Sequence, residues 1–290
     1  MTPIRASVTI PEAQRQGSAT RPARHERRAE PARVTPATTA RAGSARRTAT
    51  LLVAGDIVKK AEDARAMGGL IARTSPDLFV TTGDNAYPDG SDEDFQKYDE
   101  GLGRYRHRTL PVAGNHDHHS EGARPMLRYF GLKKLWNSRD VGPVRVIGVD
   151  SEFPDDPGQL AWLKSQLRTN KCVVVSWHKP RYSSSRHGSS SDVGPLWQAA
   201  LGKADVVVNG HDHNYERFAP QKGTREIVIG TGGASAYDFG DRESGSVVRH
   251  TGTTGGLKLT FTGNRYVAQF LPIDGSFSDR FSGTCRRGRG

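Results

Sequence analysis

The chain has 290 residues, and its 42 Lys and Arg outweigh its 31 Asp and Glu to give a net charge of +11. Residues 1–48 hold ten Arg, no Lys and three Glu, so +7 of that charge lies there and only +4 lies on the other 242 residues. The positive charge therefore does not mark residues 49–290 as a nucleic-acid-binding domain, and no specific nucleic-acid partner is expected. No stretch approaches the roughly 20 apolar residues of a membrane span, so none is expected.

Residues 1–48 are rich in Arg, Ala, Thr and Pro and contain no aromatic residue. This composition predicts a disordered basic tail. Two interpretations stay open: an arm that contacts an anionic polymer or a membrane, and a solvated leader whose start codon is misassigned. A signal peptide needs an apolar core of about 7–15 residues, and none follows Arg27-Arg28. Arg46-Arg47 run directly into the first expected strand. The sequence as written therefore predicts no export signal and leaves the compartment open.

Residues 49–290 are long enough for one large α/β domain. Strand-like apolar runs alternate with helical spacing up to residue 208, and short strands separated by turns then follow. Ser91 is expected to N-cap a helix with an acidic first turn. The expected strands are residues 50–55, 78–82, 109–113, 144–149, 172–177, 205–208, 226–229, 256–261 and 266–271. The other expected helices are residues 59–73, 122–130, 157–168 and 193–201, with Gly68-Gly69 weakening the first of them.

Polar side chains follow the ends of several of these apolar runs. In an open α/β sheet, residues at the carboxyl ends of parallel strands meet at one edge, where ligands bind. Carboxylate, amide, phenol and imidazole groups together suit first-row metal ions. There are too many such groups for one metal and enough for two. The residues are Asp56, Asp84, Tyr87, Asn115, His178, His211 and His213.

The chain has two cysteines, Cys172 at the start of an expected strand and Cys285 five residues from the end. A bond between them would tie the C-terminus to the sheet, which is useful in an oxidising compartment. Two free thiols are the alternative, and the sequence leaves both open. An extracytoplasmic location is expected only if the cysteines are bridged and the start site is misassigned.

Five sequence blocks in this order resemble the calcineurin-like metallophosphoesterase superfamily, and within it the purple acid phosphatase branch. The blocks are Asp56, GDNAY at 83–87, GNHD at 114–117, VSWH at 175–178 and GHDH at 210–213. HDHNYERF at 211–218 and GTGG at 230–233 are typical of bacterial members. The resemblance covers most of residues 50–285. It implies an α/β fold, a four-layer sandwich of two sheets flanked by helices, with residues 49–290 as the catalytic domain.

One departure from the superfamily pattern is informative. Most members use Asp-x-His in the first block, but this chain has Asp56-Ile57-Val58 and lacks that histidine ligand. The purple acid branch replaces it with the tyrosine of GDxxY, where Tyr87 stands. That branch usually has Gly at the position of Val58.

The resemblance implies two metal sites that share Asp84. The first metal would be bound by Asp56, Asp84, Tyr87 and His213, and the second by Asp84, Asn115, His178 and His211. Phenolate and carboxylates favour Fe(III) at the first site, and imidazoles with an amide oxygen favour Fe(II), Zn or Mn at the second. The implied reaction is hydrolysis of the phosphate monoester of a small molecule by a metal-bound hydroxide, as in an acid phosphatase.

Three further residues are candidates for catalysis. His116 is implied to face the substrate, either protonating the leaving oxygen or holding a phosphate oxygen. Asp117 is expected to orient His116. His187 resembles a second substrate-facing histidine of the mammalian-type purple acid phosphatases; the alternative is that His187 is merely an exposed histidine. His118 and His119 are expected to be solvated loop residues.

Two rival functions stay open. The first is a phosphodiesterase or nuclease on the same dimetal centre, whose members generally keep the histidine that this chain lacks. The second is a non-catalytic anion-binding module that uses the basic tail, although such scaffolds usually lose ligands and none is missing here. The sequence does not give the natural substrate or the oligomeric state.

Overall fold

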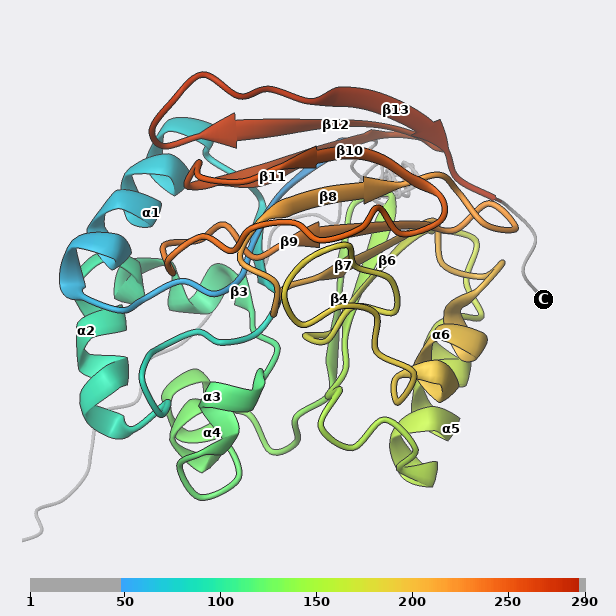
Figure 1. Ribbon diagram of the computed structural model, residues 1–290. Coiled ribbons are helices and arrows are strands. Elements are labelled where there is room, and N and C mark those ends of the chain that lie inside the picture. The colour runs from blue at the N-terminus through green and yellow to red at the C-terminus, as the bar shows by residue number, and fades with distance from the viewer. Residues whose placement is uncertain (1–47, 287–290) are drawn as a thin grey trace, which may run out of the picture. The chain divides into compact units, whose positions relative to one another are not determined.

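The computed structural model describes residues 48–286. The predicted tail at residues 1–48 therefore lies outside the described residues, except for Thr48. Within the described part, two mixed β-sheets pack face to face, and helices lie on their outer faces (Figure 1). None of the helices in this part is long and apolar enough to cross a membrane.

The first sheet has the strand order β13-β12-β11-β1-β2-β3. The neighbours β1, β2 and β3 are parallel, whereas β11, β12 and β13 pair antiparallel. Its strands are β1 (Thr48–Ala54), β2 (Leu78–Thr81), β3 (Thr109–Leu110), β11 (Gly255–Thr262), β12 (Arg265–Pro272) and β13 (Arg280–Thr284).

The second sheet has the strand order β10-β8-β9-β7-β6-β5-β4. Its centre, from β9 to β5, is parallel, and antiparallel strands close both edges. Its strands are β4 (Asn137–Val141), β5 (Val144–Gly148), β6 (Cys172–Ser176), β7 (Val206–Asn209), β8 (Tyr215–Phe218), β9 (Arg225–Ile229) and β10 (Ser246–His250).

Helices precede or follow most of the parallel strands. α1 and α2 lie on the outer face of the first sheet, and α5 and α6 lie on that of the second (Figure 1). The helices are α1 (Ala61–Thr74), α2 (Asp92–Leu102), a 3-10 helix (Gly103–Arg108), α3 (Asn115–His118), α4 (Arg124–Phe130), α5 (Pro157–Gln166) and α6 (Gly194–Ala200).

Side chains that alternate between the two faces of the central strands explain the four layers. In β1, Leu51 and Val53 point into the core between the sheets, whereas Leu52 and Ala54 belong to the core under α1. Because both faces of such a strand are buried, its sequence is a continuous apolar run rather than a polar–apolar alternation. The predicted two-sheet sandwich is therefore confirmed.

One glycine of the pair inside α1, Gly68, has a packing role. A Cβ atom on Gly68 would lie 2.4 Å from the backbone oxygen of Gly101 in α2, so the helices approach too closely there for any side chain. This contact outweighs the roughly 1 kcal/mol that glycine costs in a helix. The predicted cap of α2 is also present, because the Ser91 hydroxyl accepts the Asp94 backbone N–H at 3.2 Å.

Several elements differ from the sequence expectations. The strand expected at 109–113 is only Thr109–Leu110, since the chain leaves the sheet to begin α3 at Asn115. Four strands were not expected: β4, β8, β10 and β13. Of these, β4, β10 and β13 are edge strands with much exposed polar surface, so they lack the apolar signal of a buried strand.

The two cysteines form a disulfide, which decides between the two alternatives left open by the sequence. Cys172 and Cys285 are separated by 113 residues, and their Cα atoms are 5.2 Å apart. Cys172 begins β6 in the second sheet, and Cys285 directly follows β13 in the first. The bond therefore links the two sheets across the core.

Candidate metal centre

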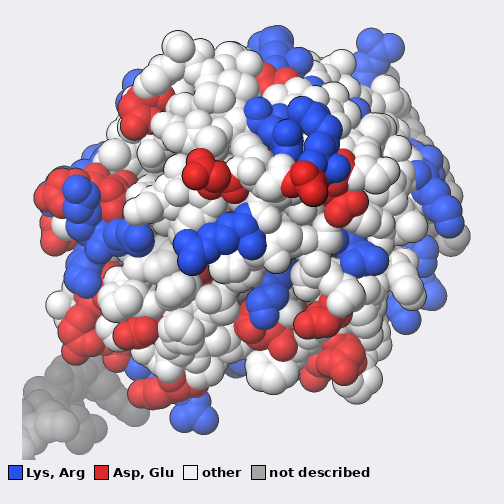
Figure 2. Space-filling model, viewed as in Figure 1, with Lys and Arg blue, Asp and Glu red and all other residues white. Residues whose placement is uncertain are grey.

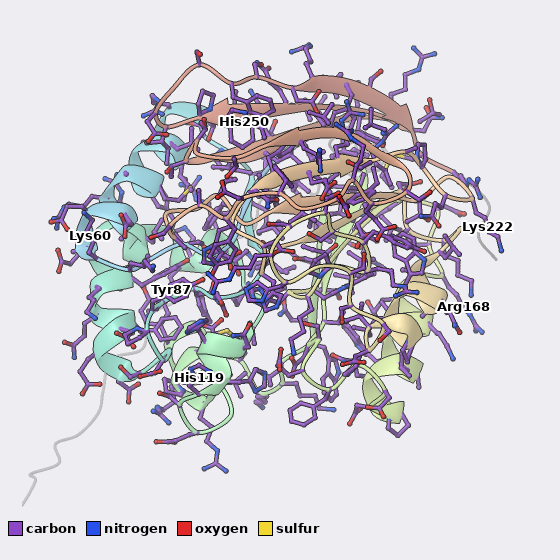
Figure 3. The ribbon with its side chains drawn as sticks, viewed as in Figure 1. Lys60, Tyr87, His119, Arg168, Lys222 and His250 are labelled. Atoms are coloured by element: carbon purple, nitrogen blue, oxygen red, sulfur yellow. A yellow bond between two sulfur atoms is a disulfide. The ribbon has the colours of Figure 1, made fainter. Side chains whose placement is uncertain are left out.

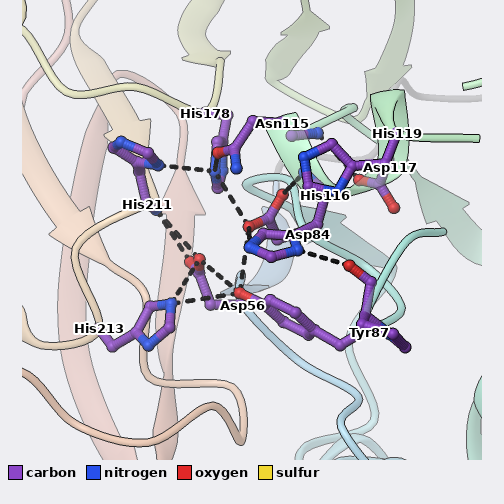
Figure 4. Close-up of polar contacts among 12 residues, drawn as sticks. Asp56, Asp84, Tyr87, Asn115, His116, Asp117, His119, His178, His211 and His213 are labelled. Carbon is purple, nitrogen blue, oxygen red and sulfur yellow. Dashed lines mark hydrogen bonds and ion pairs between the residues drawn. The ribbon is translucent and has the colours of Figure 1, made fainter. Parts of the chain in front are cut away.

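All seven predicted metal ligands lie together at the carboxyl ends of strands from both sheets (Figure 4). Asp56 follows β1, and Asp84 and Tyr87 follow β2. Parallel strands place these turns at the same sheet edge. The second sheet supplies His178 after β6, with His211 and His213 after β7, while Asn115 begins α3.

The first predicted ligand set surrounds the Tyr87 hydroxyl. That oxygen lies 3.2 Å from Oδ1 of Asp56, 3.1 Å from Oδ2 of Asp84 and 3.2 Å from Nε2 of His213. Nε2 of His213 is also 3.4 Å from Oδ1 of Asp56. Ligands held about 2.1 Å from one metal lie about 3.0–3.4 Å from each other. These donor atoms therefore suit one small metal ion.

The second set surrounds Nε2 of His178. This nitrogen lies 3.1 Å from Oδ1 of Asn115, 3.2 Å from Nδ1 of His211 and 3.4 Å from Oδ2 of Asp84. Asp84 thus faces both sets with the same carboxylate. Asp56, Asp84 and His178 also form a buried group whose ligand atoms all lie within 4.8 Å of one another. The donor chemistry and spacing fit the dinuclear site that the sequence predicts.

Backbone hydrogen bonds fix the two buried histidines. Nδ1 of His178 is 2.8 Å from the carbonyl of Thr82, and Nδ1 of His213 is 2.8 Å from the carbonyl of Ser235. A carbonyl only accepts, so each Nδ1 carries a proton, and Nε2 is the ring nitrogen that faces the site.

The turns that present the candidate ligands are strained. Asp56, Asp84 and His211 have φ angles of 58°, 50° and 71°, in the left-handed region that side chains other than glycine seldom adopt. Such strain persists where the surroundings determine it, and it clusters at functional sites. Gly114 is needed for a different reason: a Cβ there would lie 2.1 Å from Oδ1 of Asp84.

The ionisable groups of the two sets shift one another's pKa. Burial, with the carboxylates of Asp56 and Asp84, raises the pKa of Tyr87 far above its ordinary value. Burial and the charge of His178 lower the pKa of His211 to about 2. Burial opposes ionisation of Asp84, but the charge and hydrogen bond of His178, together with those of His116, outweigh it and lower the pKa of Asp84. A neutral His211 and an ionised Asp84 present lone pairs to a cation, and a cation beside Tyr87 favours its phenolate.

His116 lies beside the ligand sets and is partly exposed. Its ring is 4.5 Å from the ring of Tyr87 between centroids, and its Nε2 is 4.0 Å from Oδ2 of Asp84. Its Nδ1 lies 2.5 Å from the carbonyl of Pro88, so Nδ1 carries a proton and Nε2 faces the site. His119 is exposed, as expected, and contacts Asp89 at 3.1 Å. His118 was also expected to be solvated, but it is partly buried and its Nε2 lies 3.2 Å from Oδ1 of Asp150.

Asp117 has other partners than the ring it was expected to orient. Its buried carboxylate accepts the backbone N–H groups of Gly114 and Asn85 and the side-chain amide of Asn85, at 2.9–3.2 Å. It thereby holds the GNHD turn against the GDNAY turn. The ring of His116 is instead held by Pro88. The sequence expectation is corrected accordingly: Asp117 positions the turn that carries His116.

His187 is exposed and stacks on a predicted ligand. Its ring lies 4.1 Å from the ring of His211, and its backbone N–H donates to Asp212 at 2.9 Å. Tyr237 was not singled out from the sequence, yet its ring stacks on His213 at 4.0 Å with an interplanar angle of 14°. Tyr237 lies in an irregular loop whose sequence has no periodic pattern, so the sequence did not predict its position beside His213.

A family model described as calcineurin-like phosphoesterase matches residues 49–215, more than half of the chain. The protein belongs to the calcineurin-like phosphoesterase family, and its class is therefore that of the metallophosphoesterases. Among curated relatives, purple acid phosphatase 22 of Arabidopsis thaliana is 28% identical over 192 residues, covering 54% of this chain and 44% of that protein. The predicted resemblance to the purple acid phosphatase branch is thus confirmed.

Solved structures support the same fold. Purple acid phosphatase PPD1 from yellow lupin, Lupinus luteus, aligns with a TM-score of 0.68 and 20% identity, covering 82% of this chain and 54% of that chain. GAP50, the anchor in the inner membrane complex of Plasmodium, aligns with a TM-score of 0.64 and 17% identity, covering 83% and 90%. The chain spans 44% of the length of the Arabidopsis relative that it matches, which is less than half.

Proposed function

We propose that this metallophosphoesterase is a phosphatase that hydrolyses phosphate monoesters of small molecules, in the manner of an acid phosphatase. The observation that carries the proposal is the position of Tyr87. Its hydroxyl lies within 3.2 Å of Asp56, Asp84 and His213, in a chain that has Val58 where most superfamily members have a ligating histidine. The purple acid branch makes this substitution, whereas the diesterase branches generally keep the histidine.

The proposal includes the identity of the metals. Two carboxylates and a phenol around one site favour Fe(III), and two imidazoles with an amide oxygen favour Fe(II), Zn or Mn at the other. When bound, such a pair of ions activates water and neutralises charge on the phosphate oxygens. Asp84 links the two sites because its carboxylate faces both ligand sets.

His116 supplies the proton for the leaving oxygen or holds a phosphate oxygen. Since Nδ1 donates to Pro88, the ring carries a proton on Nε2 only as an imidazolium, and that proton points toward the site. The side chain is 34% exposed, so a substrate can reach it. His187, stacked on His211 at the rim, is a second group that can contact the phosphate.

The experiment combines elemental analysis with two chromogenic substrates. We expect about two metal ions per chain, turnover of p-nitrophenyl phosphate, and much slower turnover of bis(p-nitrophenyl) phosphate. A preference for the diester would favour the phosphodiesterase or nuclease alternative. Two bound metals without turnover of either ester would favour a non-catalytic module, for which the Plasmodium anchor shows only that the fold serves more than one role.

We also propose that the protein works outside the cytoplasm. The support is the Cys172–Cys285 disulfide, since cytosolic proteins usually keep their thiols reduced. Alkylation of thiols in intact cells, before any reduction, tests this. Protein from its native cells should resist alkylation at both cysteines, and labelling of both would contradict the proposal.

A further inference from the structure

Lys59 places an ammonium group beside the metal ligands. Its Nζ lies 5.9 Å from the centre of the Tyr87 ring and 3.3 Å from the hydroxyl of Ser235. Among the described residues, no carboxylate forms an ion pair with this ammonium. The nearby carboxylate of Asp63 instead accepts the backbone N–H groups of Lys59 and Lys60, at 3.1 and 2.9 Å.

Ser235 connects this ammonium to a cavity. The cavity has a volume of about 230 Å³, and both Ser235 and His213 line it. His213 therefore belongs both to the cavity lining and to the first ligand set. Its Nε2 faces Tyr87, and its Nδ1 donates to the backbone of Ser235. The other described residues of the wall are small or carry hydroxyl groups, among them Thr253 and Thr254, and none of them is acidic.

A bound ester must place its leaving group somewhere next to the metal ligands. The cavity is a polar space adjoining them, and the ammonium of Lys59 lies 5.9 Å from the Tyr87 ring centre and 3.3 Å from the hydroxyl of Ser235 in the cavity wall. Lysine binds phosphate as a compact point charge. The charge of an ammonium without a carboxylate partner is uncompensated and can attract an anionic ligand, whereas the charge of an ammonium in an ion pair is already compensated by its partner.

We propose that Lys59 and this cavity form a subsite for a second anionic group, carried by the leaving group of the substrate. The chemical class is a bisphosphate or diphosphate, in which one phosphoryl group lies at the metal ligands and the other at Lys59. This inference rests on the proposed phosphatase function for its kinetic part only, since binding of the second anion can be measured without turnover.

The neighbouring Lys60 is a matched control. It has the same charge and an adjacent position, but Figure 3 shows it beside α1 and apart from Tyr87. On the face shown in Figure 2, Lys and Arg side chains are interspersed with Asp and Glu rather than gathered in one field. A general attraction of polyanions would therefore respond equally to loss of either lysine, whereas a subsite would respond only to loss of Lys59.

The first measurement is calorimetric binding of inorganic pyrophosphate and inorganic phosphate to the metal-loaded protein. Lys59→Ala should weaken pyrophosphate binding about ten- to hundredfold, the usual effect of losing a contact to a charged group. Binding of inorganic phosphate should change less than about threefold. Lys59→Arg should retain most of the pyrophosphate affinity, and Lys60→Ala should match the wild type.

The second measurement compares kcat/KM for propanediol monophosphate and propanediol bisphosphate, which have similar leaving oxygens. Lys59→Ala should lower the ratio of bisphosphate to monophosphate about ten- to hundredfold. Equal effects on pyrophosphate and phosphate, or equal effects of Lys59→Ala and Lys60→Ala, would overturn the subsite. If the wild type turns over neither ester, the phosphatase proposal fails, and the calorimetric comparison still decides whether Lys59 binds the second anion.

Discussion

Tyr87 and His213 lie 126 residues apart in the sequence, yet the Tyr87 hydroxyl is 3.2 Å from Nε2 of His213. Burial, together with the two carboxylates that approach the same hydroxyl, raises the pKa of Tyr87 far above its ordinary value. A phenolate at this position therefore requires a cation within the ligand set.

Tyr87→Phe removes only the hydroxyl and keeps the buried ring. If Fe(III) binds beside Tyr87, the oxidised wild type should have a visible absorption band from charge donation by the phenolate, and the variant should lose it. The variant should also bind the first metal more weakly while keeping its fold, which circular dichroism checks. An iron-loaded wild type without the band, or a variant that keeps it, would show that Tyr87 is not a ligand.

Asp84→Asn should reduce metal content at both sites. The Asp84 carboxylate lies 3.1 Å from the Tyr87 hydroxyl and 3.4 Å from Nε2 of His178, so it serves both ligand sets. Elemental analysis should give clearly fewer than two metals per chain. Asp89→Asn is the control, because that carboxylate is mostly exposed and, among the described residues, contacts His119 alone. Full retention of two metals by Asp84→Asn would contradict the bridging role.

His116→Ala should bind metals normally and lose turnover. A general acid contributes about 10²–10⁴-fold, and this loss should be smaller for esters whose leaving groups need little protonation. The measurement is kcat for a series of aryl and alkyl phosphates, with His107→Ala, an exposed histidine, as the control. Equal losses across the series would assign His116 to phosphate binding rather than proton transfer.

Replacing both cysteines by serine should lower the free energy of unfolding by about 2–4 kcal/mol, because the bond closes a long loop in the unfolded chain. The loop spans 113 residues and joins the two sheets. Denaturant unfolding of the variant and of the wild type measures the difference. Reductant should destabilise the wild type by a similar amount and leave the double variant unchanged, and any other pattern would count against a structural disulfide.

The buried carboxyl group of Glu226 should make the free energy of unfolding decrease as the pH rises. Burial raises the pKa of this carboxyl from 4.5 to about 8, against opposing hydrogen bonds from the backbone at Arg181 and Tyr182. The folded protein therefore keeps the proton that the unfolded chain releases above pH 4.5. The stabilisation is complete below that value and is lost as pH rises to about 8.

Glu226→Gln removes this titration with little change in volume. Between pH 5 and 8, the unfolding free energy of the variant relative to the wild type should rise by up to about 1.4 kcal/mol per pH unit. Denaturant unfolding at several pH values measures it, and parallel pH profiles for the two proteins would contradict the raised pKa.

The candidate ligand positions at the strand ends were predictable from the sequence alone. Asp56, Asp84 and His178 each come shortly after an apolar run that is buried on both faces. Such strands can be recognised in the sequence because burial on both faces requires a continuous run of apolar residues. The carboxyl ends of parallel strands then share one edge by geometry. The family pattern added Tyr87, whose position complements the missing histidine at Val58.

The tertiary structure decided what depends on neighbours distant in sequence. The edge strands β4, β10 and β13 form because a partner strand offers hydrogen bonds, and their own exposed sequences carry no apolar period. The partners of Asp117, the stacking of Tyr237 on His213 and the approach of Lys59 to Ser235 arise from loops that meet only after the sheets pack. Cys172 and Cys285 could be bonded or free until folding brought the ends of two different sheets together. Local patterns encode burial and strand ends, whereas contacts between irregular loops are set by packing that no short stretch of sequence contains.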